Sequence, residues 1–259
     1  MAHVWKRRDE RPRDRENRRL DADLRRLFDL HKARYGAPRL TLDLRAEGWA
    51  VSRKRVAQRM RALGLRARAA RKYKATTQSK HSLPVAPNLL GQNFTAPAPN
   101  RAWTSDITYI WTEEGWLYLA VVMDLYSRSI VGWAMAERMT RELVMSALTM
   151  AVWRRRPEPG VVVHSDRGSQ YASGDYQALL KSHGFRCSMS RKGDCYDNAA
   201  MESFFHSLKV EQVNGCRYVT REEARADVFE YIETYYNAVR RHSTLNYLSP
   251  REFETRRVA

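Results

Sequence analysis

Three carboxylates and a lysine occupy positions from which they could act together. Asp106 lies inside a run of β-branched and aromatic residues, Asp166 follows a short apolar run, and Glu202 lies in a segment with helical periodicity. Lys209 comes seven residues, or two helical turns, after Glu202, so both side chains share one face of that helix. A carboxylate within a strand is costly to bury unless it is paired or binds a metal ion.

Asp106, Asp166 and Glu202 could together bind a hard divalent cation. Oxygen ligands without a Cys or His cluster favour Mg²⁺ or Mn²⁺ over zinc. Two such ions about 3.5–4 Å apart suit phosphodiester chemistry, because one activates the attacking oxygen and the other stabilises the leaving oxygen. We therefore predict that these three carboxylates hold two divalent ions.

The elements that must position the carboxylates follow a βββαβαβα pattern. Strands are predicted at 103–111, 116–125, 130–136, 161–163 and 185–189. Helices are predicted at 141–155, 173–183 and about 198–213. This order is that of a ribonuclease-H-like α/β fold, a mixed five-stranded sheet with flanking helices. Its first and fourth strands lie side by side and the last helix packs across them, so the three carboxylates can converge.

Positive charge is concentrated in the first third of the chain. The 259 residues carry a formal net charge of +17. Residues 1–80 hold 25 Lys and Arg against 9 Asp and Glu, whereas residues 81–259 hold 21 against 20. Such an excess is the electrostatic footprint of a nucleic-acid-binding module, and a solubilising tail is the alternative.

The basic region contains three predicted helices that resemble a small all-α helix-turn-helix module. Ser52 is the expected N-cap of the third helix, which carries four candidate DNA-binding residues, Arg53, Lys54, Arg55 and Arg59. A small bundle with a solvated basic face is the alternative. The pattern does not distinguish side chains that read bases from those that contact phosphates.

Composition divides the chain into five expected segments. These are a basic disordered N-terminus at 1–19, the helix-turn-helix module at 20–65, a basic and Pro-rich linker at 66–100, the catalytic core at 101–215 and a C-terminal helical extension at 216–259. A helix expected at 221–239 bears aromatic residues at core-like spacing. We expect it to pack on the catalytic domain or on a second protomer.

Other features of the chain limit the classes of protein. The three cysteines form no C-x-x-C pair, which supports neither a disulfide framework nor a zinc finger. The first residues carry charge without an apolar run, and no stretch approaches 18 apolar residues. We expect a reducing, cytoplasmic compartment. His164 and Asp124 are expected to shape strand ends rather than to bind metal.

Six stretches of the chain together resemble a known family. They are 35–40, 103–109, 124–133, 164–171, 197–205 and the pattern from Tyr236 to Phe253. In this order and spacing they resemble the second-reading-frame (OrfB) transposases of the insertion sequence three (IS3) family. These are DDE recombinases with a ribonuclease-H-like core and are relatives of retroviral integrases.

The resemblance implies a mechanism and partners. Asp106, Asp166 and Glu202 would hold the metal ions, and Lys209 would contact DNA near the cleaved end. Cleavage at a 3′ end of the element would free a 3′-OH that attacks another phosphodiester, without a covalent protein–DNA intermediate. The resemblance further implies a homo-oligomer on DNA, a first-reading-frame (OrfA) protein as partner or fusion, and action at the bacterial nucleoid.

Two other functions remain open at this stage. A metal-dependent nuclease without strand transfer could use the same three carboxylates. A non-catalytic DNA-binding regulator, or an inactive copy of an element, could keep the basic module alone. The presence of all three carboxylates and of Lys209 argues against decay at the site. The sequence does not identify the terminal repeat, the target or the oligomeric state.

Overall fold

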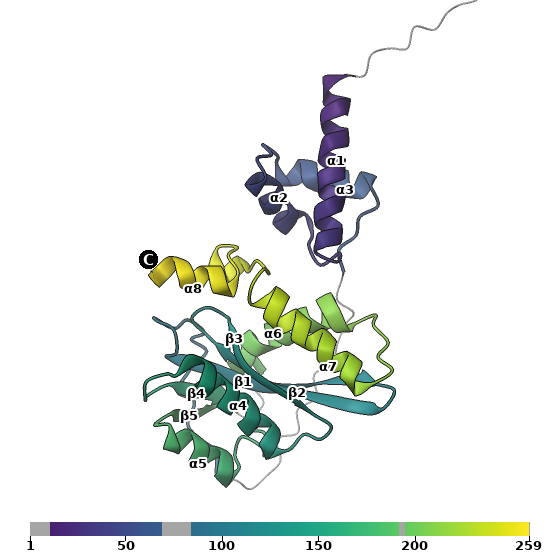
Figure 1. The fold of residues 1–259 in the computed structure, drawn as a ribbon. Helices are drawn as coiled ribbons and strands as arrows, with labels where there is room; N and C mark the ends of the chain where they lie inside the picture. Colours follow the sequence, from purple (N-terminus) through teal and green to yellow (C-terminus); the bar gives the residue numbers. More distant parts are fainter. Residues whose placement is uncertain (1–10, 69–83, 192–194, 259) are drawn as a thin grey trace, which may run out of the picture. The chain divides into compact units, whose positions relative to one another are not determined.

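The structure, a computed structural model, describes residues 11–68, 84–191 and 195–258 (Figure 1). The chain divides into two compact units, Met1–Ala70 and Arg71–Ala259. No helix among the described residues has the length and apolar character needed to cross a membrane.

The N-terminal unit is a three-helix module, as predicted. It consists of α1 (Pro12–Leu30), α2 (Ala37–Ala46) and α3 (Arg53–Ala62). Leucines from α1 and α2 and Val56 from α3 form its fully buried centre. The Ser52 hydroxyl accepts a hydrogen bond from the Arg55 backbone N–H at 3.2 Å, which confirms the predicted N-cap of α3.

Helix α1 begins earlier than the sequence suggests. Its first turns, from Pro12, lie within the 1–19 segment expected to be disordered, while residues 1–10 lie outside the described residues. Arg55 of α3 donates hydrogen bonds to Glu16 and Asn17, each at 2.9 Å. Arg59 donates to Asp21 at 2.7 Å. Polar pairs rather than apolar contacts hold these turns, so a search for apolar periodicity misses them.

The C-terminal unit is built on a five-stranded mixed sheet. Its strands are β1 (Ala102–Thr112), β2 (Gly115–Asp124), β3 (Ile130–Ala136), β4 (Val162–Ser165) and β5 (Arg186–Met189). The strand order is β3-β2-β1-β4-β5, with antiparallel pairs among the first three strands of the chain and parallel pairs between β1, β4 and β5. The predicted ribonuclease-H-like fold class is confirmed.

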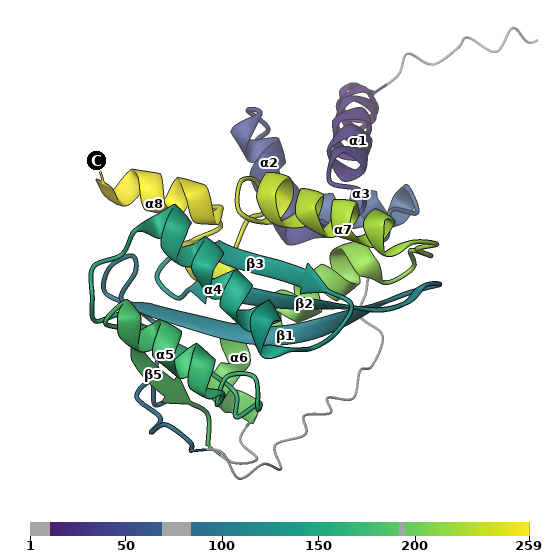
Figure 2. The same ribbon diagram turned by 60° about the horizontal axis from the view of Figure 1, so that its bottom comes forward.

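Helices cover both faces of this sheet (Figures 1 and 2). On one face lie α4 (Arg141–Arg155) and α5 (Gly174–Ser182), and on the other lie α6 (Ala199–Leu208) and α7 (Arg221–Phe229). The core between the sheet and α4 closes around Gly132 of β3. A Cβ there would overlap the Ala147 carbonyl oxygen and lie 2.7 Å from the Ala151 backbone N.

Part of the expected linker at 66–100 packs on the sheet of the C-terminal unit. The Leu89 backbone N–H donates to the Ser188 hydroxyl of β5 at 2.9 Å, and the Asn88 amide donates to Asp197 at 3.0 Å. Leu90 is buried. Residues 88–90 therefore extend the fold beside β5, although their Pro-rich surroundings predict only irregular structure.

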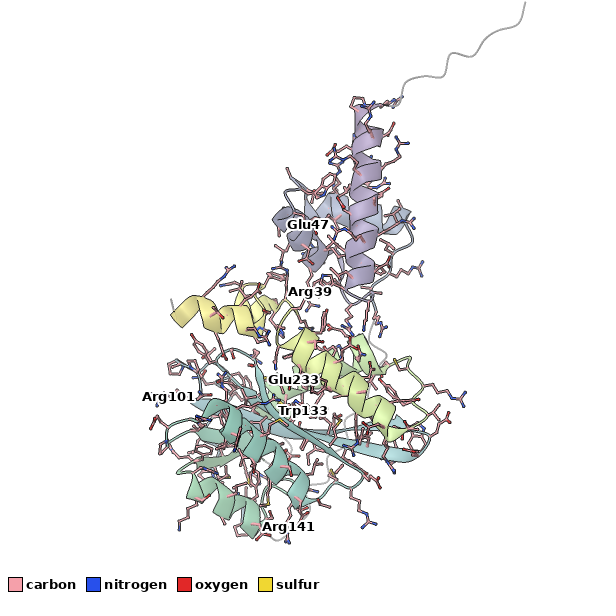
Figure 3. The ribbon with its side chains drawn as sticks, viewed as in Figure 1. Arg39, Glu47, Arg101, Trp133, Arg141 and Glu233 are labelled. Carbon is pink, nitrogen blue, oxygen red and sulfur yellow. The ribbon has the colours of Figure 1, made fainter. Side chains whose placement is uncertain are left out.

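The C-terminal extension packs on the free edge of β3. After α7 the chain forms a π-helical stretch, η3 (Glu230–Tyr236), and later α8 (Pro250–Val258). Asn237 binds both backbone groups of Ile130 through its side-chain amide, each at 2.9 Å. Glu233 accepts a hydrogen bond from the Trp133 indole at 2.7 Å (Figure 3). The extension thus satisfies a strand edge that would otherwise be open to pairing.

A buried ion pair ties the extension to the end of α6. Helix α6 continues as a π-helical turn, η2 (Lys209–Val213). Arg240 donates to both carboxylate oxygens of Glu211 at 2.8 and 2.7 Å, and a further bond reaches the Ser207 hydroxyl at 2.9 Å. Tyr231 donates a third hydrogen bond to the carboxylate at 2.9 Å. The pair holds the turn that begins at Lys209.

Replacing Gly132 with alanine is expected to destabilise the C-terminal unit by about 2 kcal/mol or more, because the methyl group would force β3 away from α4. Urea unfolding measures the change. Gly174→Ala is the control, since nothing lies within 4 Å of a Cβ there. Equal stability of the two variants would contradict the close contact.

Arg240→Met should cost about 3–5 kcal/mol in free energy of unfolding, because it leaves the Glu211 carboxylate buried without its partner. Arg217→Met is the matched control, since that arginine pairs with Glu113 but is 85% exposed. Its loss should cost less than about 1 kcal/mol. Similar costs for the two variants would show that burial does not set the value of the pair.

Candidate active site

Asp106 lies just beyond the end of the pairing between β1 and β4. The parallel pairing of β1 with β4 covers Ala102 to Thr104, so Asp106 comes two residues beyond its end. The side chain is partly buried, and its Oδ1 accepts a hydrogen bond from the Ile107 backbone N–H at 2.7 Å. This bond fixes the carboxylate beside the gap that the short β4 leaves.

Asp166 follows the last residue of β4, at the carboxyl end of the neighbouring strand. Its Oδ1 accepts a hydrogen bond from the Gly168 backbone N–H at 2.9 Å. A Cβ on Gly168 would lie 3.0 Å from this same oxygen, which explains why glycine suits the position. Parallel neighbouring strands thus bring Asp106 and Asp166 to one region of the sheet.

The charges of these carboxylates act on one another. Burial and, next to it, the negative charge of Asp166 raise the pKa of Asp106 well above its ordinary value. Glu202 adds to this rise, whereas the Ile107 N–H and the Lys209 ammonium oppose it. The structure therefore brings Asp106 and Asp166 together and leaves Glu202 within electrostatic reach.

Glu202 stands in the first turn of α6, as the helical periodicity predicts. Its side chain is largely exposed, and partial burial of the carboxyl group raises its pKa. The start of α6 is fixed to β1 by a buried hydrogen bond from the Thr104 hydroxyl to the Asn198 side chain at 2.5 Å. Glu202 is thus carried by a helix that is anchored next to Asp106.

The donor chemistry fits hard divalent cations. Asp106 and Asp166 offer oxygen ligands, and a cation would relieve the like-charge cost that raises the pKa of Asp106. Among the described residues no three Asp, Glu, His or Cys side chains are gathered closely enough to hold one ion. Glu202 would have to turn towards the pair to join them.

Lys209 is half-buried at the start of η2. Its Nζ lies 4.9 Å from the centroid of the Tyr109 ring, in a cation–π contact. Burial lowers the pKa of Lys209, and Tyr109 and Asp106 oppose this change. The ammonium group therefore stands beside the carboxylates, on the side of Tyr109.

Sequence reasoning assigned no role to Tyr171, which is within electrostatic reach of the two aspartates. Its hydroxyl is 3.1 Å from the Ser105 hydroxyl, and the ring is fully buried. Burial and the charges of Asp106 and Asp166 raise its pKa well above the ordinary value. The sequence gives no local indication that Tyr171 lies near the aspartates, because the loop that follows β4 brings them together.

His164 and Asp124 serve the fold, as expected. The His164 ring is buried and forms hydrogen bonds with the Ser188 and Ser190 hydroxyls at 2.8 and 3.2 Å. Burial lowers its pKa. Asp124 accepts hydrogen bonds from the backbone N–H groups of Asn100 and Tyr126 at 2.8 and 3.0 Å.

The four basic residues singled out on α3 have different surroundings. Arg53 and Lys54 are exposed. Arg55 and Arg59 form ion pairs with Glu16 and Asp21 of α1. The module thus offers two of the predicted side chains to solvent and uses the other two to hold α3 against α1.

Comparison with known families matches three segments of the chain. An integrase core domain matches residues 96–195, and a second integrase core domain model matches residues 202–258. An HTH-like domain matches residues 14–73. The matched segments cover the N-terminal module, the sheet with its candidate carboxylates and the C-terminal extension.

Individual relatives share most of the chain. Transposase InsF for insertion sequence IS3A from Escherichia coli K12 is 56% identical over 232 residues, which cover 90% of this chain and 81% of the relative. An uncharacterized 31 kDa protein of insertion element IS600 from Shigella sonnei is 46% identical over 249 residues, 96% of this chain and 92% of the relative.

A solved structure shows the same fold at low identity. A chain of the simian T-cell lymphotropic virus intasome, in complex with the PP2A regulatory subunit B56 gamma, matches with a TM-score of 0.50 and 16% identity. The match covers 89% of this chain and 74% of that chain. The family matches and the 56% identity to InsF together show that the chain belongs to the IS3 family of transposases, DDE-type polynucleotidyl transferases.

Proposed function

We propose that this transposase cleaves the 3′ ends of its element and transfers the freed strands, with Asp106, Asp166 and Glu202 as the ligands of two Mg²⁺ or Mn²⁺ ions. The observation that carries the proposal is the placement of Asp106 on β1, two residues beyond its pairing with β4, beside Asp166, which directly follows β4. In agreement with this placement, the charge of Asp166 raises the pKa of Asp106. Because two neighbouring carboxylates repel each other when both are ionised, a divalent cation bound between them would be stabilising.

Each residue of the site has a physical role in this proposal. The three carboxylates would hold the ions, which would supply positive charge to the attacking and leaving oxygens. The N–H groups of Ile107 and Gly168 hold the two aspartates in place. Lys209 offers its ammonium group to a phosphate of the strand being cut. Tyr171, fully buried within electrostatic reach of the aspartates, excludes water from their surroundings.

The basic module is proposed to bind the element ends. Arg53 and Lys54 are exposed on α3 and would contact DNA, whereas Arg55 and Arg59 brace the helix from behind. Recombinases that join two ends need at least two protomers, so we propose a homo-oligomer on DNA with the OrfA protein as partner or fusion. Action would take place in the bacterial cytoplasm, at the nucleoid.

Strand transfer is tested with labelled element-end DNA and Mg²⁺, with and without the OrfA protein. Asp166→Asn and Glu202→Gln should keep DNA binding and reduce joined products at least about 100-fold, as expected when a few kcal/mol of transition-state stabilisation are lost. Glu222→Gln is the control, because Glu222 is also exposed in a first helical turn, that of α7.

The products distinguish the proposed function from its alternatives. Joined DNA that disappears in both site variants supports strand transfer. Hydrolysis without joining would identify a nuclease. Binding without any reaction, even with OrfA present, would identify a regulator or an inactive copy.

Arg53→Ala/Lys54→Ala should weaken binding of duplex DNA and reduce the salt dependence of the affinity by about two units of slope, because two phosphate contacts are lost. Fluorescence anisotropy over a range of salt concentrations measures both. Arg15→Ala/Arg25→Ala removes the same charge from exposed positions of α1 and should change the slope less. Equal slopes for the two variants would show that α3 is not the contacting helix.

A further inference from the structure

Three aromatic rings form a ladder along the β1–β2 hairpin. Trp111 and Trp116 lie directly opposite each other across the two strands, with ring centroids 4.8 Å apart. Tyr109 meets Trp116 edge to face at 4.9 Å. At the other end, the Lys209 ammonium lies over the Tyr109 ring. This aromatic ladder, Tyr109–Trp116–Trp111, therefore runs from the candidate active site towards the end of the hairpin.

The outer rings of the ladder are exposed. Trp111 is 58% and Trp116 is 43% exposed, and the hairpin extends beyond α4 and α6 (Figures 1 and 2). A cross-strand aromatic pair stabilises a hairpin, but it does not require two indoles to remain in water. Adjacent exposed aromatic rings that continue into a binding site are typical of a recognition surface.

The charges at the hairpin end are balanced. Glu113 pairs with Arg217, and Glu114 accepts a hydrogen bond from the Arg221 backbone N–H at 2.7 Å. The Arg221 guanidinium in turn donates to the Trp116 carbonyl at 3.2 Å. These contacts hold the hairpin rigidly and leave little net charge at its end. What the ladder offers a ligand is the faces and edges of its rings, with one cation at the inner end.

We propose that the aromatic ladder binds unpaired nucleotides of the DNA strand that leaves the active site. Bases would stack on Trp111 and Trp116, and the Lys209 ammonium would contact a phosphate between them and the carboxylates. Bases in a duplex are already stacked on one another, so the ladder selects single-stranded DNA. The inference rests on the proposed function, since that function brings DNA to Lys209.

Binding without catalysis tests the ladder. Fluorescence anisotropy in the presence of a chelator compares a blunt duplex, the same duplex with a short single-stranded tail, and one with an abasic tail. The full-length protein should prefer the tailed duplex by about 10-fold or more, in line with stacking of one or two bases. The abasic tail keeps the phosphates and should lose the preference.

Variants assign this preference to the rings. Trp111→Ala/Trp116→Ala should bind the tailed and blunt duplexes equally, with unchanged affinity for the blunt duplex. Trp111→Phe/Trp116→Phe should restore most of the preference, whereas Trp111→Leu/Trp116→Leu should not, which separates stacking from folding. Trp153→Ala is the matched control, because Trp153 is 77% exposed on α4 and away from the ladder.

The outcomes separate this inference from the proposed function. An unchanged preference in the alanine variant would overturn the ladder. The ladder would also be overturned if the alanine variant shifted the monomer–dimer balance in sedimentation while its DNA preference stayed, because the rings would then be a protein interface. If the alanine variant lost the preference for the tailed duplex, but the unmodified protein showed no strand transfer, the ladder would be supported and the proposed chemistry would be overturned.

Discussion

The short parallel pairing between β1 and β4 is the constraint on which the rest of the catalytic unit depends. Because it stops at Thr104, β1 continues past Asp106 paired with β2 alone, and no strand pairs with its other edge beyond the end of β4. The same three residue pairs set Asp166 beside Asp106. A longer β4 would have covered this edge with backbone hydrogen bonds and carried Asp166 away from its partner.

The helix that bears the third carboxylate is fixed at both ends by buried polar contacts. At its start, Thr104 holds Asn198, and at its end Arg240 holds Glu211. The second contact comes from a segment 29 residues further along the chain. The C-terminal extension therefore helps to determine where the π-helical turn presents Lys209, a residue of the candidate site.

Apolar periodicity predicted most of the fold, and polar contacts account for the differences. The strand Ile130–Ala136 has the predicted bounds, because β-branched and aromatic residues between turns define it locally. The first turns of α1 were missed because arginines from α3 hold them. Composition predicts a linker at residues 88–90, because their anchors, Ser188 and Asp197, lie about a hundred residues away. Spacing indicated the three carboxylates, but not the burial of Tyr171 near them.

The candidate site contains groups that a stable core would not contain, and such exceptions are expected at functional sites. Two like charges share a partly buried position, a lysine loses part of its hydration, and two indoles remain in water. The first two features oppose folding and the third leaves apolar surface in water, and all of them lie along one strand, β1, or face it. Divalent ions would relieve the first and DNA the other two. The proposed complex with metal ions and DNA would thus supply partners for the carboxylates, the lysine and the exposed rings along β1.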